Sequence, residues 1–305
     1  MAQLGIDYAD TDTITKPGVA GFQQAKAAGA RIIIPRAVFG RPANSQYPVY
    51  LDSYWARDKD DIVAAGLNRS AYLFVTVPTI ARPIVPSPEV QAAAFYGYVQ
   101  LNKPKAGQKP QDMVPFFDVE QASDKLTAEE YYQWILKVAM EMRRAFGAWP
   151  GMYTSDRVWN EVLKSHAAGK LINCPLWIAK PWPWAVRTPV HLDGAPGYNP
   201  TTMPEYGDTT NWILYQYQGD GLGMPGFTPG AVDMNRVNVV KRGVSGSIVK
   251  WIQARAGGGL VVDGVFGANT ETRIKELQAQ YAMTADGIVG IDTLTLLSWL
   301  NPAPL

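Results

Sequence analysis

Four acidic residues, Asp7, Asp118, Glu120 and Asp233, each end an apolar stretch that is typical of a buried strand. Because side chains alternate along a strand, Asp118 and Glu120 point to the same side. Carboxyl groups that lie close together repel, which raises the pKa of at least one and keeps it protonated nearer to neutral pH. One protonated acid beside one carboxylate is what hydrolysis of a glycosidic bond requires. For any single one of the four, a helix cap or a surface turn is the alternative interpretation.

A fold must bring these carboxylates together, and the alternation of strand-like and helix-like segments predicts which one. Strands are expected over residues 4–8, 31–38, 71–77, 113–119, 151–154, 175–179, 212–217 and 231–234. Helices are expected near residues 19–28, 60–65, 89–100, 127–146 and 156–166, and Thr127 with Glu130 forms a capping box for the longest. Alternating βα units with eight strands indicate an α/β fold, a (β/α) barrel.

The barrel is expected to be irregular. Helical signals fail after residue 179, and the stretches 180–210 and 218–230 are rich in Pro, Gly and aromatic residues. The last third of the barrel is therefore predicted to be poor in helices. In a parallel barrel, active-site residues lie at the C-terminal ends of strands. The first, fourth and eighth strands meet around one mouth, so we expect the four carboxylates to cluster there.

The last 60 or so residues contain an internal repeat. Residues 262–270 align with residues 285–293, with identity at Asp263/Asp286, Gly264/Gly287, Gly267/Gly290 and Thr270/Thr293. Each copy is typical of a turn followed by a helix start. Apolar spacing predicts three short helices, hence a small all-α three-helix bundle. We therefore expect a barrel over 1–240, a linker over 241–247 and the bundle over 248–305. Plain turn chemistry, without a ligand, is the alternative explanation of the repeated residues.

Composition removes other kinds of chemistry. The chain has 305 residues, 28 Lys plus Arg against 27 Asp plus Glu, two His and one Cys. A net charge of +1 argues against nucleic-acid binding, and no apolar run is long enough to span a membrane. Cys174 precedes an apolar strand, and His166 and His191 lie in unrelated segments, which disfavours thiol and zinc hydrolases. We expect no metal and no cofactor.

Six motifs then resemble one family, the family 25 glycoside hydrolases, which are muramidases common among phage endolysins and bacterial autolysins. They are Gly5-Ile-Asp7, Phe117-Asp-Val-Glu120, Met152-Tyr-Thr-Ser155, Leu176-Trp-Ile-Ala179, Leu214-Tyr-Gln-Tyr217 and Val232-Asp-Met-Asn235. The resemblance implies cleavage of the β-1,4 bond from N-acetylmuramic acid to N-acetylglucosamine. It also implies that Glu120 is the general acid, while Asp7, Asp118 and Asp233 shape the electrostatics and position water or substrate. The repeat-containing tail resembles the peptidoglycan-binding type 1 domain.

The chain departs from the family pattern around the wall that would contact sugar. Tyr72-Leu-Phe74 stands where Tyr-His-Phe is usual, and Pro181 stands where a Tyr is common. Aromatic side chains that could stack on sugar rings, or could simply pack in the core, are Tyr72, Tyr153, Trp182, Trp184 and Tyr217. Arg36 could hold a carboxylate or a substrate group, with a structural ion pair as the alternative.

These observations together predict a peptidoglycan hydrolase of the phage endolysin type. With no encoded signal peptide, it would be made in the host cytoplasm and would act on the cell wall after release. We expect a monomer whose only partner is bacterial peptidoglycan and whose bundle raises the local concentration at the wall. A non-catalytic wall-binding protein with a relic barrel is one alternative, although the presence of Glu120 favours an enzyme. A bacterial autolysin is the other.

Overall fold

The computed structural model describes residues 3–9, 14–40, 49–155, 158, 163, 170–179, 212–218, 224–228 and 232–300. The described strands form a closed eight-stranded barrel, because β1 pairs with β2 as well as with β10. In order around the ring they are β1 (Leu4–Tyr8), β10 (Asp233–Val237), β9 (Trp212–Gln218), β8 (Leu176–Ala179), β7 (Gly151–Ser155), β6 (Phe116–Val119), β5 (Tyr72–Phe74) and β2 (Ala30–Gly40). Two short strands, β3 (Val49–Leu51) and β4 (Asn68–Arg69), also pair with β2. The predicted barrel is confirmed.

One strand of the barrel runs against the others. β10 is antiparallel to both β1 and β9, whereas the other neighbouring pairs of the ring are parallel. The prediction that Asp233 ends the eighth strand is therefore wrong, since Asp233 is the first residue of β10. A reversed strand begins at the end of the barrel where the parallel strands finish. Asp233 thus reaches the expected mouth from the opposite direction.

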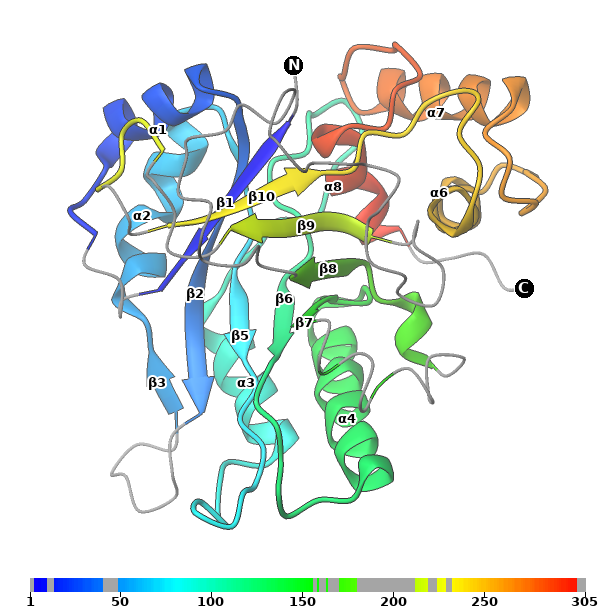
Figure 1. Cartoon of the computed structure of the whole chain (residues 1–305). Helices are drawn as coiled ribbons and strands as arrows, with labels where there is room; N and C mark the ends of the chain where they lie inside the picture. Colours follow the sequence, from blue (N-terminus) through cyan, green and yellow to red (C-terminus); the bar gives the residue numbers. More distant parts are fainter. Residues whose placement is uncertain are drawn as a thin grey trace.

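The helices between the first strands lie where the sequence predicted, with shifted ends. They are α1 (Gly18–Ala27), α2 (Ser53–Ala64), α3 (Pro88–Tyr98) and α4 (Ala128–Phe146), and Figure 1 shows them outside the barrel. The predicted capping box starts α4, because the Glu130 N–H donates to Thr127 Oγ1 at 3.3 Å and the Thr127 N–H donates to the Glu130 carboxylate at 2.9 Å. α2 begins earlier than predicted because the Asp52 carboxylate caps it.

The C-terminal residues form the predicted three-helix bundle of α6 (Ser247–Ala256), α7 (Ala268–Gln280) and α8 (Ile291–Trp299). A glutamine holds each repeated turn. Gln253 Nε2 donates to Asp263 Oδ1 at 2.8 Å and to Thr270 Oγ1 at 3.2 Å, and its Oε1 accepts from the Gly264 N–H at 2.9 Å. In the second repeat the same contacts join Gln278 to Asp286, Thr293 and Gly287.

These contacts explain the repeated residue types. Gly264 and Gly287 have φ values of +80° and +75°, which favour glycine. The side chains of the aspartates and threonines form their hydrogen bonds within the turns. The structural interpretation of the repeat therefore accounts for these residues without a ligand.

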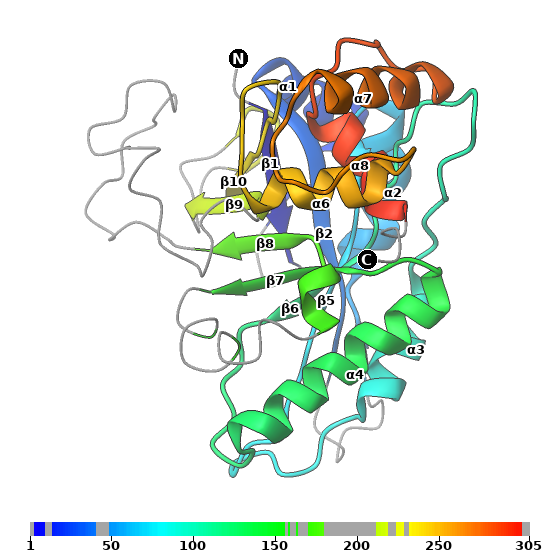
Figure 2. The same cartoon turned by 90° about the vertical axis from the view of Figure 1, so that its right-hand side faces the viewer.

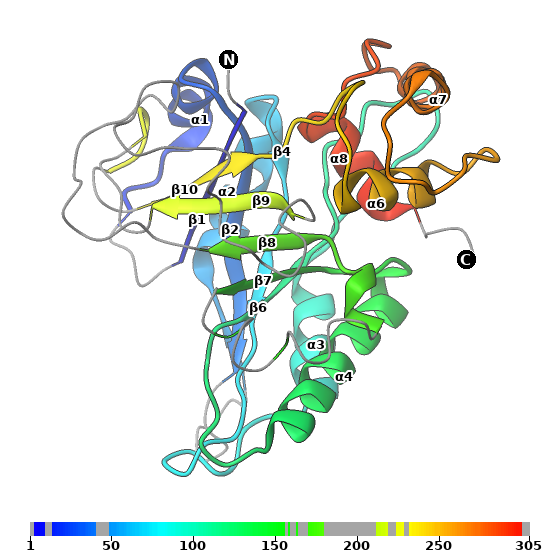
Figure 3. The same cartoon turned by 45° about the vertical axis from the view of Figure 1, so that its right-hand side comes forward.

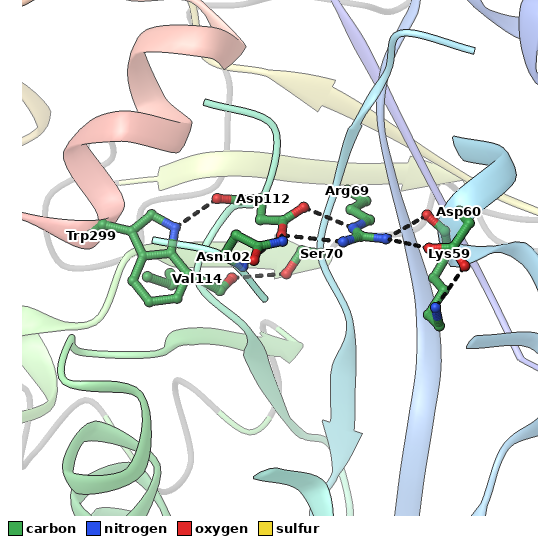
Figure 4. A network of polar contacts seen from close by, with 8 residues as sticks. All are labelled: Lys59, Asp60, Arg69, Ser70, Asn102, Asp112, Val114 and Trp299. Carbon is green, nitrogen blue, oxygen red and sulfur yellow. Dashed lines mark hydrogen bonds and ion pairs between the residues drawn. The ribbon is translucent and has the colours of Figure 1, made fainter. Parts of the chain in front are cut away.

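Figures 2 and 3 both show the bundle packed against the end of the barrel that lies opposite the mouth. Trp299 Nε1 donates to the Asp112 carbonyl at 2.6 Å, and the Val114 N–H donates to Ser298 Oγ at 3.3 Å. Asp112 and Val114 precede β6, so they lie where the parallel strands begin. On the barrel side, the Asp112 carboxylate is paired with Arg69, and Figure 4 shows the contacts running from Asp60 through this ion pair to the tryptophan.

The segment expected to be a linker is itself paired with the bundle. Val240 forms a β-bridge with Val289, and Ser245 forms one with Val265. The chain between β10 and α6 is thus held to the bundle by these two β-bridges. The division at residues 240 and 247 stays a prediction.

Several predicted features lie outside the described residues. They are Trp182, Trp184, His166, His191, most of the helix expected over 156–166, the stretch 180–210 and much of 218–230. Within the described part of the chain, no helix is both long enough and apolar enough to span a membrane.

Candidate active site

The structure brings the four predicted carboxylates together at one end of the barrel. Asp7, near the end of β1, lies directly opposite Asp233 in the antiparallel pairing with β10. Asp118 lies in β6, and Glu120 follows that strand. Asp7 and Asp118 are buried, with exposed fractions of 5% and 4%. The negative charges of Asp233 and Glu120 both act on Asp7, and those of Glu120 and Asp7 act on Asp118. Their catalytic roles stay predictions.

Two buried amides hold this cluster, and the sequence analysis did not single them out. Gln216 Nε2, on β9, donates to Asp233 Oδ2 at 2.9 Å and to Asp7 Oδ1 at 3.3 Å. Asn235 Nδ2, on β10, donates to Asp7 Oδ1 at 2.7 Å. Strand alternation could have found Asn235, which stands two residues after Asp233 and so faces the same side. Gln216 could have been noticed as a polar residue that follows four apolar or aromatic residues of the same strand.

An aromatic group supports the cluster. Trp177 Nε1 donates to Asn235 Oδ1 at 2.6 Å, and its ring centroid lies 4.6 Å from that of Tyr153 and 6.1 Å from that of Tyr72. Tyr72 and Tyr153 are only 8% and 7% exposed. Packing against Trp177 therefore accounts for both rings, and their proposed stacking on sugar stays a prediction. Trp177 was another residue that the sequence analysis did not select.

The Tyr153 hydroxyl links the amides to the acid pair. It donates to Gln216 Oε1 at 2.7 Å, and it also forms a hydrogen bond with Glu120. A phenol carries a single O–H, so it donates to one of these groups at a time. The hydrogen bond with Tyr153 lowers the pKa of Glu120 and so opposes the rise that burial causes.

Asp118 and Glu120 form an interacting acid pair. The hydrogen bond between their side chains raises the pKa of Asp118 and lowers that of Glu120. Burial raises the pKa of both groups above the ordinary values. Repulsion from Glu120 and Asp7 raises the pKa of Asp118 further. The pair thus retains a proton at a higher pH than an ordinary carboxyl group does.

The Asp118→Asn variant is expected to unfold less readily than the wild type at neutral pH. Burial and repulsion raise the pKa of Asp118 in the folded protein above the ordinary 3.8. The protonated carboxyl group therefore contributes its full stability below about pH 3.8, and this contribution is lost as the pH rises through the pKa of the folded state. Each unit of such a shift costs about 1.4 kcal/mol at high pH. The amide of Asp118→Asn does not titrate, so the variant does not lose this stability at high pH. Its advantage over the wild type should shrink as the pH falls toward 4. Urea unfolding between pH 4 and pH 8 measures it; a gain independent of pH would contradict this assignment.

Two other predicted site residues have structural partners. Arg36 Nε donates to the fully buried Asp52 carboxylate at 3.1 Å, and the Arg36 guanidinium also acts to lower the pKa of Asp118. The structural ion pair, the alternative for Arg36, is therefore present. Tyr217 alternates with Gln216 along β9 and so faces away from the carboxylates; burial raises its pKa to about 12. Substrate binding by either residue stays a prediction.

The chemistry available at the mouth is that of carboxyl groups. Cys174 is buried, and burial raises the pKa of its thiol to about 12, so it supplies no thiolate at neutral pH. The cluster instead offers a retained proton beside several carboxylates. That combination suits general acid catalysis with stabilisation of a positive centre.

Comparisons with known proteins agree with this chemistry. The model of the glycosyl hydrolases family 25 matches residues 10–224, and that of a peptidoglycan-binding domain matches residues 245–297. The fold resembles that of the bacterial lysozyme from Streptomyces coelicolor, with 20% identity, a TM-score of 0.55 and coverage of 78% of this chain and 93% of that one. A family 25 lysozyme from Aspergillus fumigatus gives 20% identity, a TM-score of 0.52 and coverage of 78% and 94%. Comparison with curated proteins gave no match.

The family model covers most of the chain and includes the strands that carry Asp118, Glu120 and Gln216. The solved structures share the fold over 78% of this chain. The chain therefore belongs to the glycosyl hydrolases of family 25 and is a glycoside hydrolase joined to a peptidoglycan-binding domain.

Proposed function

We propose that the protein hydrolyses the β-1,4 bond between N-acetylmuramic acid and N-acetylglucosamine of peptidoglycan, with Glu120 as the general acid. The observation that carries the proposal is the gathering of Asp7, Asp118, Glu120 and Asp233 at the barrel mouth, where burial raises the pKa of both Asp118 and Glu120. The peptidoglycan-binding domain in the same chain supports peptidoglycan as the glycan presented to that mouth. The solved lysozymes and muramidases of the same fold carry activities that agree with this substrate.

The roles follow from burial and charge. Glu120 is the less buried member of the acid pair, so it is the one that reaches the leaving oxygen and donates the proton. The positive charge that develops on the sugar is stabilised by the negative charges of the three aspartates. Gln216 and Asn235 keep Asp7 fixed through N–H donors, which removes the need to reorient it during the reaction.

Mass spectrometry of digested peptidoglycan tests the bond assignment. We expect fragments whose reducing end is N-acetylmuramic acid. Fragments that end in N-acetylglucosamine would show that the other glycosidic bond is cut. No new fragments, together with binding to walls, would favour the alternative of a non-catalytic wall-binding protein.

We also propose that the protein acts as a phage endolysin, made in the host cytoplasm and active on the wall after release, as a monomer. A wall-cutting barrel fused to a wall-binding bundle supports this role. A bacterial autolysin is the alternative. Appearance of the protein in cells only after phage induction would support the endolysin, and its presence in uninfected growing cells would support the autolysin.

A further inference from the structure

The two repeats of the bundle carry one pocket each, built on the same scaffold. The first-repeat pocket is a cavity of about 580 Å³ beside the Asp263 turn, and the second-repeat pocket is one of about 260 Å³ beside the Asp286 turn. In both, the glutamine, the aspartate of the turn and the threonine described above line the pocket. The pockets differ in what lies across their openings.

Residues of the barrel reach into the second-repeat pocket. Gln3 and Lys109 line it together with bundle residues. Gln3 Oε1 accepts the Ile291 N–H at 2.7 Å, and Lys109 pairs with Asp292 at 2.8 Å. A Cβ placed on Gly290 would meet the Gln3 side chain at 2.7 Å. The second repeat is thus used to attach the bundle to the barrel.

The first-repeat pocket is open. All of its lining residues come from the bundle, within the described residues 253–276. A Cβ placed on Gly267, the counterpart of Gly290, would meet nothing within 4 Å. Val261 and Val265 stand 74% and 55% exposed at this pocket, whereas Ile288, the counterpart of Val265, is 37% exposed. Solvent-exposed apolar side chains beside an open cavity are a surface suited to a ligand.

The lining favours a peptide over a sugar. None of the described residues that line the first-repeat pocket is aromatic, so no ring is offered to a sugar face. Leu260, Val261 and Val265 supply apolar contacts for small side chains. Arg273 and Glu276, paired at 3.0 Å, place opposite charges at the rim, suited to the carboxylate and ammonium groups of a short peptide.

We propose that the first-repeat pocket binds the stem peptide of peptidoglycan, while the second repeat holds the bundle to the barrel. This assignment rests on the proposed function, in which peptidoglycan is the substrate. It implies that two separate sites of the protein recognise peptidoglycan. The barrel mouth takes the glycan, and the bundle takes the peptide.

The test uses the full chain and soluble stem peptides that an amidase has released from purified peptidoglycan. Calorimetric titration should show binding to the wild type. Val265→Asp should weaken it at least about tenfold, because it places an unpaired carboxylate on the apolar wall of the pocket. Ile288→Asp is the matched control in the second repeat and should bind the peptides as the wild type does. Val261→Asp, at a still more exposed position, repeats the test where folding is not at risk.

The proposal is overturned if the peptides do not bind, or if Val261→Asp and Val265→Asp bind them as tightly as the wild type. It is also overturned if Ile288→Asp weakens binding as much as Val265→Asp, with all variants folded by circular dichroism. Release of reducing ends from glycan chains stripped of peptides reports separately on the barrel. Hydrolysis of those chains without peptide binding would leave the proposed function standing and remove only the peptide site.

Discussion

The Glu120→Gln variant is expected to release reducing ends from peptidoglycan about 10²- to 10⁴-fold more slowly than the wild type, the range typical for loss of a general acid. Glutamine has nearly the same shape, but its amide does not donate a proton to a glycosidic oxygen. Burial raises the pKa of Glu120, so a neutral amide at this position is not expected to destabilise the fold. The variant should therefore melt at or above the wild-type temperature while losing its activity.

Glu89→Gln is the matched control for this substitution. Glu89 lies at the start of α3, and its hydrogen bond with Lys137 lowers its pKa to about 2, so it holds no proton at working pH. This control is expected to keep the wild-type rate. Equal rates for Glu120→Gln and the wild type, with both folded, would show that another group supplies the proton.

The sequence predicted the acids better than it predicted their supports. Asp118 and Glu120 were identifiable because strand alternation alone places them on one side. Asp233 was placed at the wrong end of its strand, because strand direction depends on which neighbours a strand pairs with and not on its own residues. Gln216 and Asn235 stand within two of the six motifs but were not chosen as site residues, because an isolated amide carries no chemistry of its own. Their role exists only once β9 and β10 lie beside β1.

The same distinction holds for the fold. Capping and alternation are local, so the strands, α4 and the three bundle helices were predictable. The attachment of the bundle to the barrel was not, because its contacts join residues such as Asp112 and Trp299, which are 187 positions apart. The repeat and the expected linker suggested a tethered module, whereas packing places α8 against the end of the barrel opposite the mouth.

This attachment gives the second large effect. Asp112→Ala is expected to lower the free energy of unfolding by about 3–5 kcal/mol, the usual consequence of removing one partner of a buried ion pair. The Asp112 carboxylate accepts from Arg69 Nε at 2.7 Å and from the backbone and side-chain N–H groups of Asn102 at 2.6 and 2.9 Å. Without it, the Arg69 guanidinium stays buried and keeps the Lys59 carbonyl at 2.7 Å, but the nearest carboxylate that the structure then gives it is the exposed Asp60 at 3.4 Å.

Urea unfolding followed by tryptophan fluorescence measures this loss, and hydrogen exchange at α8 shows whether the bundle loosens with the barrel. Both measurements should show the loss of stability, because Asp112 lies between Arg69 and Trp299 where the barrel contacts the bundle (Figure 4). Glu141→Ala is the control, since it breaks the pair with the exposed Arg144 and should cost less than about 1 kcal/mol. A loss for Asp112→Ala no larger than this control's would mean that the ion pair contributes little. Unchanged hydrogen exchange at α8 would mean that the other contacts with the barrel, such as those of Gln3 and Lys109, are enough to hold the bundle.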